Sequence, residues 1–348
     1  MTDRRSFLKK GVGVLALPAL PAISPRFWET RSMQVVRPPR LREGDTVGII
    51  SPAGITWDPD RLAIFEESLA ALGFRTRTGA HALDRWGYLA GHDHDRADEI
   101  NSMFADPTVD AIFALAGGWG AARLLPLLDY DVVRANPKIV LGFSDVTSLL
   151  LGLYAKTGLV TFHGPTGNST WNGFTVDHVR RVLMQGEAVT FVNPKDQGDH
   201  LTQVDNRIHT IQEGRASGRL VGGNLTVLTA IVGSDYLPDW RGHILFLEDV
   251  GEDVYRVDRM LTQLSLAGVL GQISGFVFGR CSDCDSEGGY GSFTLKEVLA
   301  HHIEPLGIPA FHGSMIGHIR DKFTVPLGVE AEIDATAGSI RLLQAAVT

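Results

Sequence analysis

Two stretches of the chain follow one plan, in which an apolar run of strand length passes through a glycine-containing turn into a helical pattern. The first, VDAIFALAGGWGAARLLPLL, covers residues 109–128, and the second, KIVLGFSDVTSLLLGLYAKTG, covers residues 138–158. An uninterrupted apolar strand is typical of a parallel sheet that helices cover on both faces. The repeated plan therefore predicts an α/β fold with a mostly parallel sheet, whose functional residues lie at the carboxyl ends of its strands.

The same alternation of strand and helix extends over most of the 348 residues, a length that suits two domains. It begins near residue 45, is interrupted by a polar, irregular stretch, and resumes with the segment GRLVGGNLTVLTAIVG. The tail AEIDATAGSIRLL is typical of a hairpin. We expect an N-terminal α/β domain at 41–167, a connection at 168–214 and a C-terminal β/α domain at 215–348.

The N-terminal stretch TDRRSFLKKGVGVLALPALPA differs from the rest, because basic residues precede a short, mildly apolar run. The pair Arg4 and Arg5, followed by an apolar run from Gly11 to Leu20, resembles a twin-arginine (Tat) export signal. We expect residues 1–30 to be this signal peptide and leader, and the Tat translocon to be a partner during export. The mature protein would then be periplasmic or extracellular, and the alternative is a frayed, basic N-terminus.

The overall composition excludes one class of partner. The formal net charge is −8 and no basic stripe is visible, so nucleic-acid binding is not expected. Hydrophobic residues make up 44% of the chain, which is ordinary for a globular protein with a full core. No later run reaches transmembrane length.

Two short clusters contain cysteine or histidine, the residues that commonly bind metals, but neither has the complete spacing of a metal site. Cys281 and Cys284 form a single C-x-x-C, and no second pair completes a zinc site. They are either a local disulfide or free thiols, and a structural role in a loop is favoured over redox catalysis. In GHDHDRADEI, His92 and His94 alternate as chelating residues do, but the residues that follow are typical of a solvated helix start. No metal and no cofactor are therefore expected.

Ser144 lies at the corner between the second apolar strand and its helix. A serine in that place is commonly a helix N-cap, whose side chain accepts a hydrogen bond from a helix N–H. The corner is also the place of a nucleophile elbow, but the G-x-S-x-G pattern is not matched, because position 146 is valine. The residues alone leave both interpretations open.

A serine nucleophile needs a base, a group that orients the base, and N–H donors for the developing oxyanion. Glu248 ends an apolar strand in ILFLEDVGE, and His318 stands in a glycine-flanked loop in HGSMIGHIRDKF. In the loop AGGWG, Gly117 and Gly118 let the backbone approach a substrate carbonyl, and Asp145, which follows the serine, supplies a second N–H. Each feature also has a plainer interpretation. Glu248 would be a helix-capping acid and His318 a solvated loop residue. The loop AGGWG would be a phosphate cradle, although it lacks the lysine of a P-loop.

Six segments appear in an order that resembles one known family: AGGWGAARLLPLLD, LGFSDVTSLL, FHGP, VGGNLTVL, ILFLEDVGEDVYRVDRML and GHIRDKFTVPLGVEAEID. They resemble the L,D-carboxypeptidase family of serine peptidases, which includes the muramoyl-tetrapeptide carboxypeptidases and the microcin-immunity peptidases. The resemblance covers about residues 41–343, nearly the whole mature chain. It implies an α/β N-terminal domain that carries the serine, a swivelling β/α C-terminal domain that carries the other two triad residues, and a possible homodimer.

The resemblance also assigns roles to residues of this chain. It implies a catalytic triad of Ser144, Glu248 and His318, and an oxyanion hole made by the backbone of Gly118 and Asp145. Trp119 and Asn224 are candidate substrate-binding residues.

The activity that the resemblance implies is hydrolysis of an amide between an L-centre and a D-amino acid. The expected reaction is release of the terminal D-Ala from a murein tetrapeptide. Two other functions stay open, namely serine hydrolysis of another amide such as a peptide-antibiotic conjugate, and non-catalytic binding of wall peptides. Export departs from the family members that recycle wall peptides in the cytoplasm, and it leaves the physiological substrate open.

Overall fold

The computed structural model describes residues 34–284 and 292–348. The twin-arginine stretch expected at residues 1–30 therefore lies outside the described residues. Within the described ranges, the chain contains no helix that combines the length and the apolar character needed to cross a bilayer.

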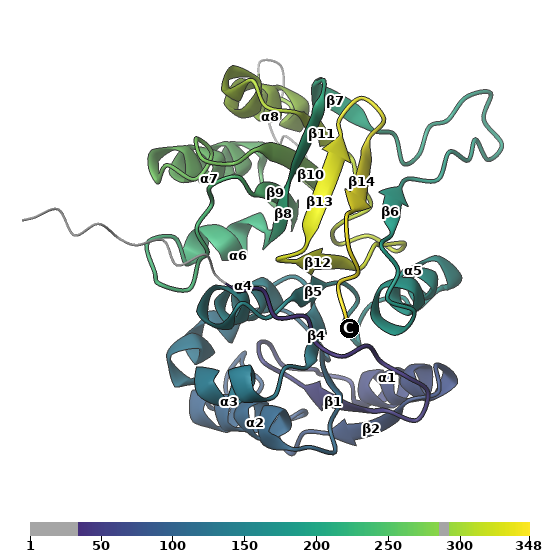
Figure 1. Ribbon diagram of the computed structural model, residues 1–348, viewed down its shortest axis with the longest axis vertical. Coiled ribbons are helices and arrows are strands. Elements are labelled where there is room, and N and C mark those ends of the chain that lie inside the picture. The colour runs from purple at the N-terminus through teal and green to yellow at the C-terminus, as the bar shows by residue number, and fades with distance from the viewer. Residues whose placement is uncertain (1–33, 285–291) are drawn as a thin grey trace, which may run out of the picture. The chain divides into compact units, whose positions relative to one another are not determined.

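The first sheet has six strands in the order β12-β5-β4-β3-β1-β2, and the five from the N-terminal half run parallel (Figure 1). Every residue of the two central strands β3 and β4 is buried, which explains their uninterrupted apolar runs. The expected α/β class with a mostly parallel N-terminal sheet is thus confirmed. The strands are β1 (Thr46–Ile50), β2 (Arg75–Thr78), β3 (Ala111–Ala114), β4 (Ile139–Gly142), β5 (Thr161–His163) and β12 (Val325–Leu327).

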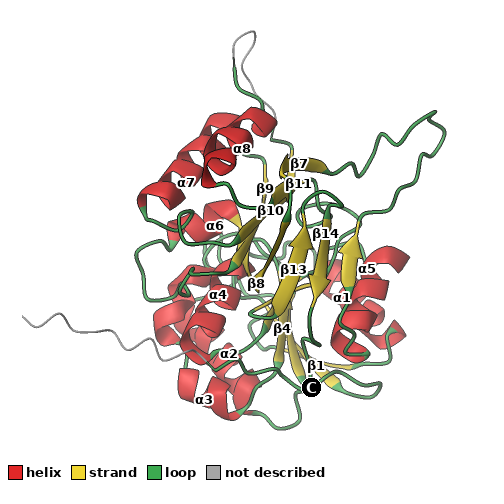
Figure 2. Ribbon diagram, turned by 45° about the horizontal axis from the view of Figure 1, so that its top comes forward, coloured by secondary structure: helices red, strands yellow, loops and turns green. Residues whose placement is uncertain are grey.

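Helices cover both faces of this sheet (Figure 2). One face carries α1 and the other carries α2, α3 and α4. The expected helix after the glycine-rich turn is instead a 3₁₀ helix, η1, because Pro126 inside it cannot donate a helical hydrogen bond. The bounds are α1 (Pro59–Ala71), α2 (Asp93–Ala105), η1 (Ala121–Leu127), α3 (Tyr130–Ala135) and α4 (Val146–Thr157).

The second sheet has eight strands in the order β6-β14-β13-β8-β9-β10-β11-β7. The central strands β8 to β11 are parallel, whereas the outer strands pair antiparallel. The antiparallel pair β13 and β14 confirms the expected hairpin in the tail. The strands are β6 (Thr190–Val192), β7 (His209–Gln212), β8 (Arg215–Asn224), β9 (Ile244–Val250), β10 (Gly275–Ser282), β11 (Ala310–His312), β13 (Glu330–Asp334) and β14 (Ser339–Leu342).

Further helical segments accompany the second sheet in the described part of the chain. Thr294 and Glu297 form a reciprocal capping box at the start of α8, which fixes the beginning of that helix. The segments are α5 (Gly173–Val179), a π-helical turn (Arg180–Met184), α6 (Leu225–Ala230), α7 (Val254–Leu266) and α8 (Leu295–Ile303), which continues as a 3₁₀ turn (Glu304–Leu306).

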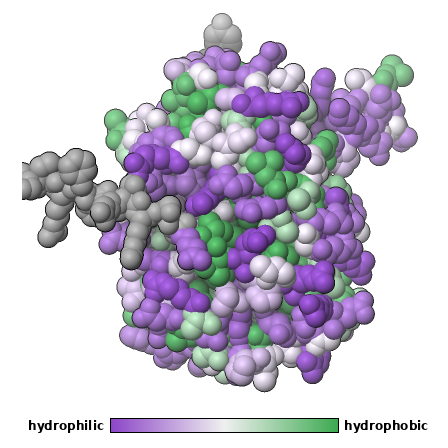
Figure 3. Space-filling view, in the orientation of Figure 1, coloured by the Kyte–Doolittle hydropathy of each residue, from purple (hydrophilic) through white to green (hydrophobic). Residues whose placement is uncertain are grey.

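The segment 168–214 does more than connect two domains. Its strands β6 and β7 form the two edges of the second sheet, and the polar loop between them projects away from it (Figures 1 and 3). These strands are short and largely exposed, so they lack the apolar runs that predict strands from sequence. In the other direction, β12 from the C-terminal half completes the first sheet beside β5. Each half therefore depends on strands that a simple two-domain division does not predict.

The two sheets meet where helix α4 approaches the end of β8. The backbone N–H of Asn224 donates to Oγ1 of Thr147 over 3.0 Å. Gly223 allows this approach, because a Cβ at its position would lie 2.6 Å from the Thr147 side chain. Since Asn224 pairs with Glu248 across β8 and β9, this contact brings the carboxyl end of β9 close to the helix that follows Ser144.

Candidate active site

Ser144 occupies a strained backbone corner between β4 and α4. Its φ of 62° lies in the left-handed region, which is uncommon for a residue with a side chain. A Cβ at Gly142 would lie 2.7 Å from Cγ1 of Val146, so the chain needs glycine on the strand side of the corner. Helix α4 begins at Val146 with Asp145 at its N-cap position and no side-chain cap. Ser144 is therefore not a helix cap, and its strained corner is typical of a nucleophile elbow.

The glycine loop after β3 lies directly against this corner. A Cβ at Gly117 would lie 2.8 Å from Cβ of Ser144 and 3.0 Å from its Oγ. The same point lies 3.4 Å from the backbone nitrogen of Asp145. Gly118, with a φ of 113°, continues the turn in a conformation that favours glycine. The glycine loop and the backbone of Asp145 thus lie beside Ser144, and the oxyanion hole of Gly118 and Asp145 stays a prediction.

The Asp145 side chain holds the glycine loop in place. Its Oδ2 accepts a hydrogen bond of 2.7 Å from the backbone N–H of Ala121, just after the loop. Burial raises the pKa of this carboxyl to about 6, and the bond from Ala121 and the nearby charge of Arg96 only partly offset that effect. Arg96, which is 1% exposed, donates to the carbonyl oxygens of Pro52 and Gly120 and so fixes the loop from its other side.

We predict that Gly117→Ala lowers kcat by about 10²–10³-fold, the loss typical of a displaced oxyanion donor. The added methyl group would collide with Ser144 and push the loop away from it. Gly271→Ala is the matched control, because a Cβ there meets nothing within 4 Å. Steady-state kinetics and thermal unfolding would be measured on both variants. A Gly117→Ala protein with more than a third of the wild-type kcat would contradict this geometry.

Glu248 and His318 form a buried carboxylate–imidazole pair. Nδ1–H of His318 donates to Oε2 of Glu248 over 2.8 Å, and the glutamate side chain is fully buried. Gly317, at a φ of 134°, makes room for the pair, because a Cβ there would lie 3.1 Å from Oε2. Burial opposes ionisation of Glu248, but the hydrogen bond and charge of His318 outweigh it and lower the pKa of the carboxyl. This pair leaves Nε2 of His318 as the nitrogen available for proton transfer.

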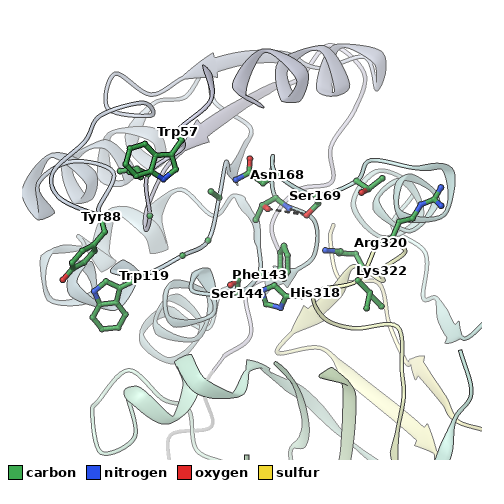
Figure 4. A pocket seen from close by; sticks show the side chains of 18 residues that line it. Trp57, Tyr88, Trp119, Phe143, Ser144, Asn168, Ser169, His318, Arg320 and Lys322 are labelled. Atoms are coloured by element: carbon green, nitrogen blue, oxygen red, sulfur yellow. Dashed lines mark hydrogen bonds between the residues drawn. The ribbon is translucent and has the colours of Figure 1, made fainter. Parts of the chain in front are cut away.

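Ser144 and His318 line one cavity of about 950 Å³ (Figure 4). The imidazole packs against the ring of Phe143, the residue before the serine, with 4.7 Å between ring centroids. Within the described ranges, Oγ of Ser144 and the imidazole share no hydrogen bond, as is common in sites without substrate. The structure thus brings all three predicted triad residues to one place.

The two predicted substrate-binding residues differ in position. Trp119 is 50% exposed and lines the cavity together with Trp57 and Tyr88, which form an aromatic end (Figure 4). Asn224 is 3% exposed and does not line the cavity. Its amide instead accepts from the backbone of Val227 as the N-cap of α6 and donates to Asp249 over 3.0 Å. A role for Asn224 in substrate binding stays a prediction, and its contacts favour a role in holding the end of β8.

The cysteine pair and the histidine-containing segment make structural contacts instead of binding a metal in the described residues. Cys281 and Cys284 are joined as a disulfide, which decides between the two sequence alternatives. Asp93 binds Arg96 and Arg123, and the ring of His92 packs on Trp86 with 4.7 Å between centroids. Across the described residues, no group of three or more histidine, cysteine, aspartate or glutamate side chains is placed to hold a metal ion.

Among the residues not singled out from the sequence are two buried ionisable side chains beside Ser144, His163 and Lys322. His163, at the end of β5, is buried between Phe143 and Phe246, and burial lowers its pKa to about 4. Lys322 is 4% exposed and lines the cavity. Both lie in segments that carry the family resemblance, FHGP and GHIRDKFTVPLG, but nothing local to those segments predicts burial beside Ser144.

The fold and the grouping of a serine, a histidine and a glutamate at one cavity are typical of serine hydrolases. Two family models match it, the LD-carboxypeptidase N-terminal domain at residues 47–164 and the LD-carboxypeptidase C-terminal domain at residues 217–333. The probable murein peptide carboxypeptidase of Bacillus subtilis is 34% identical over 90% of this chain and 95% of its own length. The chain therefore belongs to the LD-carboxypeptidase family, which confirms the resemblance noted in its sequence.

Two further relatives have solved structures. The Microcin C7 self-immunity protein MccF of Escherichia coli is 32% identical over 84% of this chain and 92% of its own length. A structure of MccF without ligand superposes with a TM-score of 0.82 over 90% of this chain and all of that one. A muramoyltetrapeptide carboxypeptidase from Oxalobacter formigenes superposes with a TM-score of 0.74, at 30% identity over 85% of this chain and 97% of its own.

Proposed function

We propose that this protein is a serine carboxypeptidase that hydrolyses an L,D-amide bond and releases the terminal D-Ala of murein tetrapeptides. The observation that carries the proposal is the cavity in which the strained Ser144 faces an imidazole bound to a buried carboxylate. Relatives named as murein peptide carboxypeptidases support the choice of substrate.

The first half of the reaction forms an acyl-enzyme. Nε2 of His318 takes the proton of Ser144 as Oγ bonds to the scissile carbonyl carbon. The carbonyl electron pair moves to the oxygen, which accepts hydrogen bonds from the backbone N–H groups of Gly118 and Asp145. The carbonyl then re-forms, the C–N bond breaks, and the imidazolium returns its proton to the leaving amine. Glu248 stabilises the imidazolium and keeps its ring oriented.

The second half restores the enzyme. A water molecule attacks the ester carbon while His318 accepts the water proton, and the same N–H groups hold the second oxyanion. When the C–O bond breaks, the proton passes from His318 to Oγ of Ser144. The products are the shortened peptide with a new carboxylate and the free D-amino acid, so that one water is consumed and no redox change occurs.

Defined muropeptides test this proposal. The protein would be incubated with tetrapeptides that end in D-Ala or L-Ala, and with the corresponding tripeptide, and the products read by mass spectrometry. We expect loss of one alanine from the D-ended tetrapeptide alone. Binding of that tetrapeptide without any cleavage would instead identify a non-catalytic wall-peptide binder.

A second candidate function is cleavage of an amide in a peptide-antibiotic conjugate. The close structural match to MccF favours it, as does the aromatic end of the cavity, where Trp57, Tyr88 and Trp119 offer exposed rings for stacking. An aminoacyl sulfamoyl nucleoside offered beside the muropeptides would separate the two functions. In both cases we propose that Trp119 contacts the acyl part of the substrate.

We also propose that the protein is exported through the twin-arginine route. The disulfide between Cys281 and Cys284 supports export, because disulfides persist mainly in oxidising compartments.

Replacing both Arg4 and Arg5 by lysine should leave the precursor in the cytoplasm, because the translocon recognises the arginine pair. Cell fractionation and immunoblotting would measure the distribution, with Lys9→Arg and Lys10→Arg as the matched control outside the pair. Normal export of the double lysine variant would refute this route.

A further inference from the structure

One buried cation of the cavity has no part in the mechanism above. Lys322 lines the same cavity as Ser144 and is 4% exposed. Its ammonium lies 3.9 Å from the centroid of the Phe143 ring. Its backbone N–H donates to Oγ1 of Thr175 over 3.3 Å. For the ammonium itself, the described parts of the chain (34–284 and 292–348) offer no hydrogen bond and no ion pair.

The Lys322 side chain is largely buried, and its ammonium, which keeps some access to the cavity, has no hydrogen-bond or ion-pair partner among the described residues, an arrangement that is costly for a charge. Burial lowers the pKa of Lys322 to about 8, an effect that the carboxylate of Glu248 partly opposes, so the group is still mainly protonated at neutral pH. The cation–π contact with Phe143 offsets only part of the cost. An anion inside the cavity would supply the missing partner.

Lys138 shows how this chain satisfies a buried lysine that has only a structural role. It is 7% exposed, and its ammonium donates to the carbonyl oxygens of Met103 and Asp106. Lys322 has no such carbonyl partners, although it is buried to a similar degree. The difference favours a ligand rather than the fold as the partner of Lys322.

The position of Lys322 relative to the nucleophile restricts what this ligand can be. Phe143 directly precedes Ser144, and its ring contacts both the Lys322 ammonium and the His318 imidazole. In a peptide whose last residue is to be removed, only the amide nitrogen and the α-carbon separate the scissile carbonyl from the terminal carboxylate. A cation that binds this carboxylate must therefore lie beside the nucleophile, as Lys322 does.

Arg320 is the other Lys or Arg side chain that lines the cavity in the described structure. Its side chain is 78% exposed and lies 3.7 Å from the carboxylate of Asp321. An exposed pair of this kind contributes little, because water and salt screen it. Arg320 is thus a poor candidate for the same role and a good control.

We propose that the ammonium of Lys322 binds the α-carboxylate of the leaving residue and so restricts cleavage to the C-terminal amide. This inference rests on the proposed carboxypeptidase function. The substrate then lies with its C-terminus toward Lys322 and its remainder toward the aromatic end, with Ser144 and His318 between them (Figure 4). The charge-assisted hydrogen bond to the carboxylate is worth about 10- to 100-fold in affinity.

The kinetic test compares a tetrapeptide ending in D-Ala with its C-terminal carboxamide. We expect the wild type to favour the carboxylate by about 10- to 100-fold in kcat/KM, mainly through KM. Lys322→Met should abolish this preference by lowering kcat/KM for the carboxylate peptide by about 10- to 100-fold more than for the carboxamide, Lys322→Arg should keep part of it, and the control Arg320→Met should keep all of it. Equal losses on both peptides would overturn the inference, because they would show a structural or general catalytic role.

A binding test separates this inference from the choice of reaction. Ser144→Ala and Ser144→Ala/Lys322→Met proteins would be titrated calorimetrically with both peptides, and circular dichroism would check folding, with Lys322→Gln used if the methionine variant does not fold. The inference is supported if Ser144→Ala binds the carboxylate peptide selectively and Ser144→Ala/Lys322→Met does not. This holds even if the wild type cleaves neither peptide, because that result would refute only the proposed reaction. Equal binding of the two peptides, or no binding of either, would overturn the inference.

Discussion

Ser144→Ala should lower kcat by at least about 10⁴-fold, because it removes the atom that attacks the scissile carbonyl. His318→Ala should cause a loss of similar size, since the serine then has no base. The two residues act as a unit, so the double variant should be hardly slower than either single variant. Rates of D-Ala release from a tetrapeptide by the three variants would measure this non-additivity.

Ser169→Ala is the matched control, because Ser169 lines the same cavity and its Oγ accepts from the backbone N–H of Thr166 over 3.0 Å. It should change kcat little. Circular dichroism would check that each variant folds, as expected for substitutions in loops at strand ends. Turnover by Ser144→Ala above about a tenth of the wild-type rate would mean that the chemistry lies elsewhere in the chain.

The corner around Ser144 shows what local sequence can predict and what it cannot. The apolar strand and the helical pattern place a turn at this residue, and the structure has one there. The strained φ of Ser144 and the contact of Gly142 with Val146 depend on packing between a strand and a helix. A search for G-x-S-x-G fails here, because valine and not glycine stands at position 146. Gly142 has no side chain, and Cγ1 of Val146 fills the space that a Cβ at Gly142 would need.

The pairing of Glu248 with His318 is beyond local reasoning, because the two residues are 70 positions apart, with Glu248 in β9 and His318 in the loop between β11 and β12. The family resemblance, and not periodicity or spacing, predicted their meeting. Lys322 was missed for a related reason. It precedes β12, which leaves the C-terminal half and joins β5 of the first sheet, and this exchange buries the lysine against Phe143.

Glu248→Gln should lower kcat by about 10²–10⁴-fold while the fold is kept. Glutamine has nearly the shape of glutamate but carries no charge to stabilise the imidazolium. Its amide can also turn its NH₂ group toward Nδ1 of His318, which would place the imidazole proton on Nε2 and leave no base for Ser144. Asp249→Asn is the matched control, since Asp249 is buried on the same strand but binds Asn224 and Thr226 instead of the histidine.

The stability of Glu248→Gln should also depend on pH in a defined direction. The pKa of Glu248 is lowered in the folded state, so its ionisation stabilises the fold above the unfolded pKa of about 4.3. This contribution is lost as the pH falls through the lowered folded pKa. The difference in free energy of unfolding between wild type and Glu248→Gln, measured by urea titration, should therefore shrink on acidification. A difference that grows at low pH would mean that Glu248 is protonated in the native protein and cannot stabilise an imidazolium.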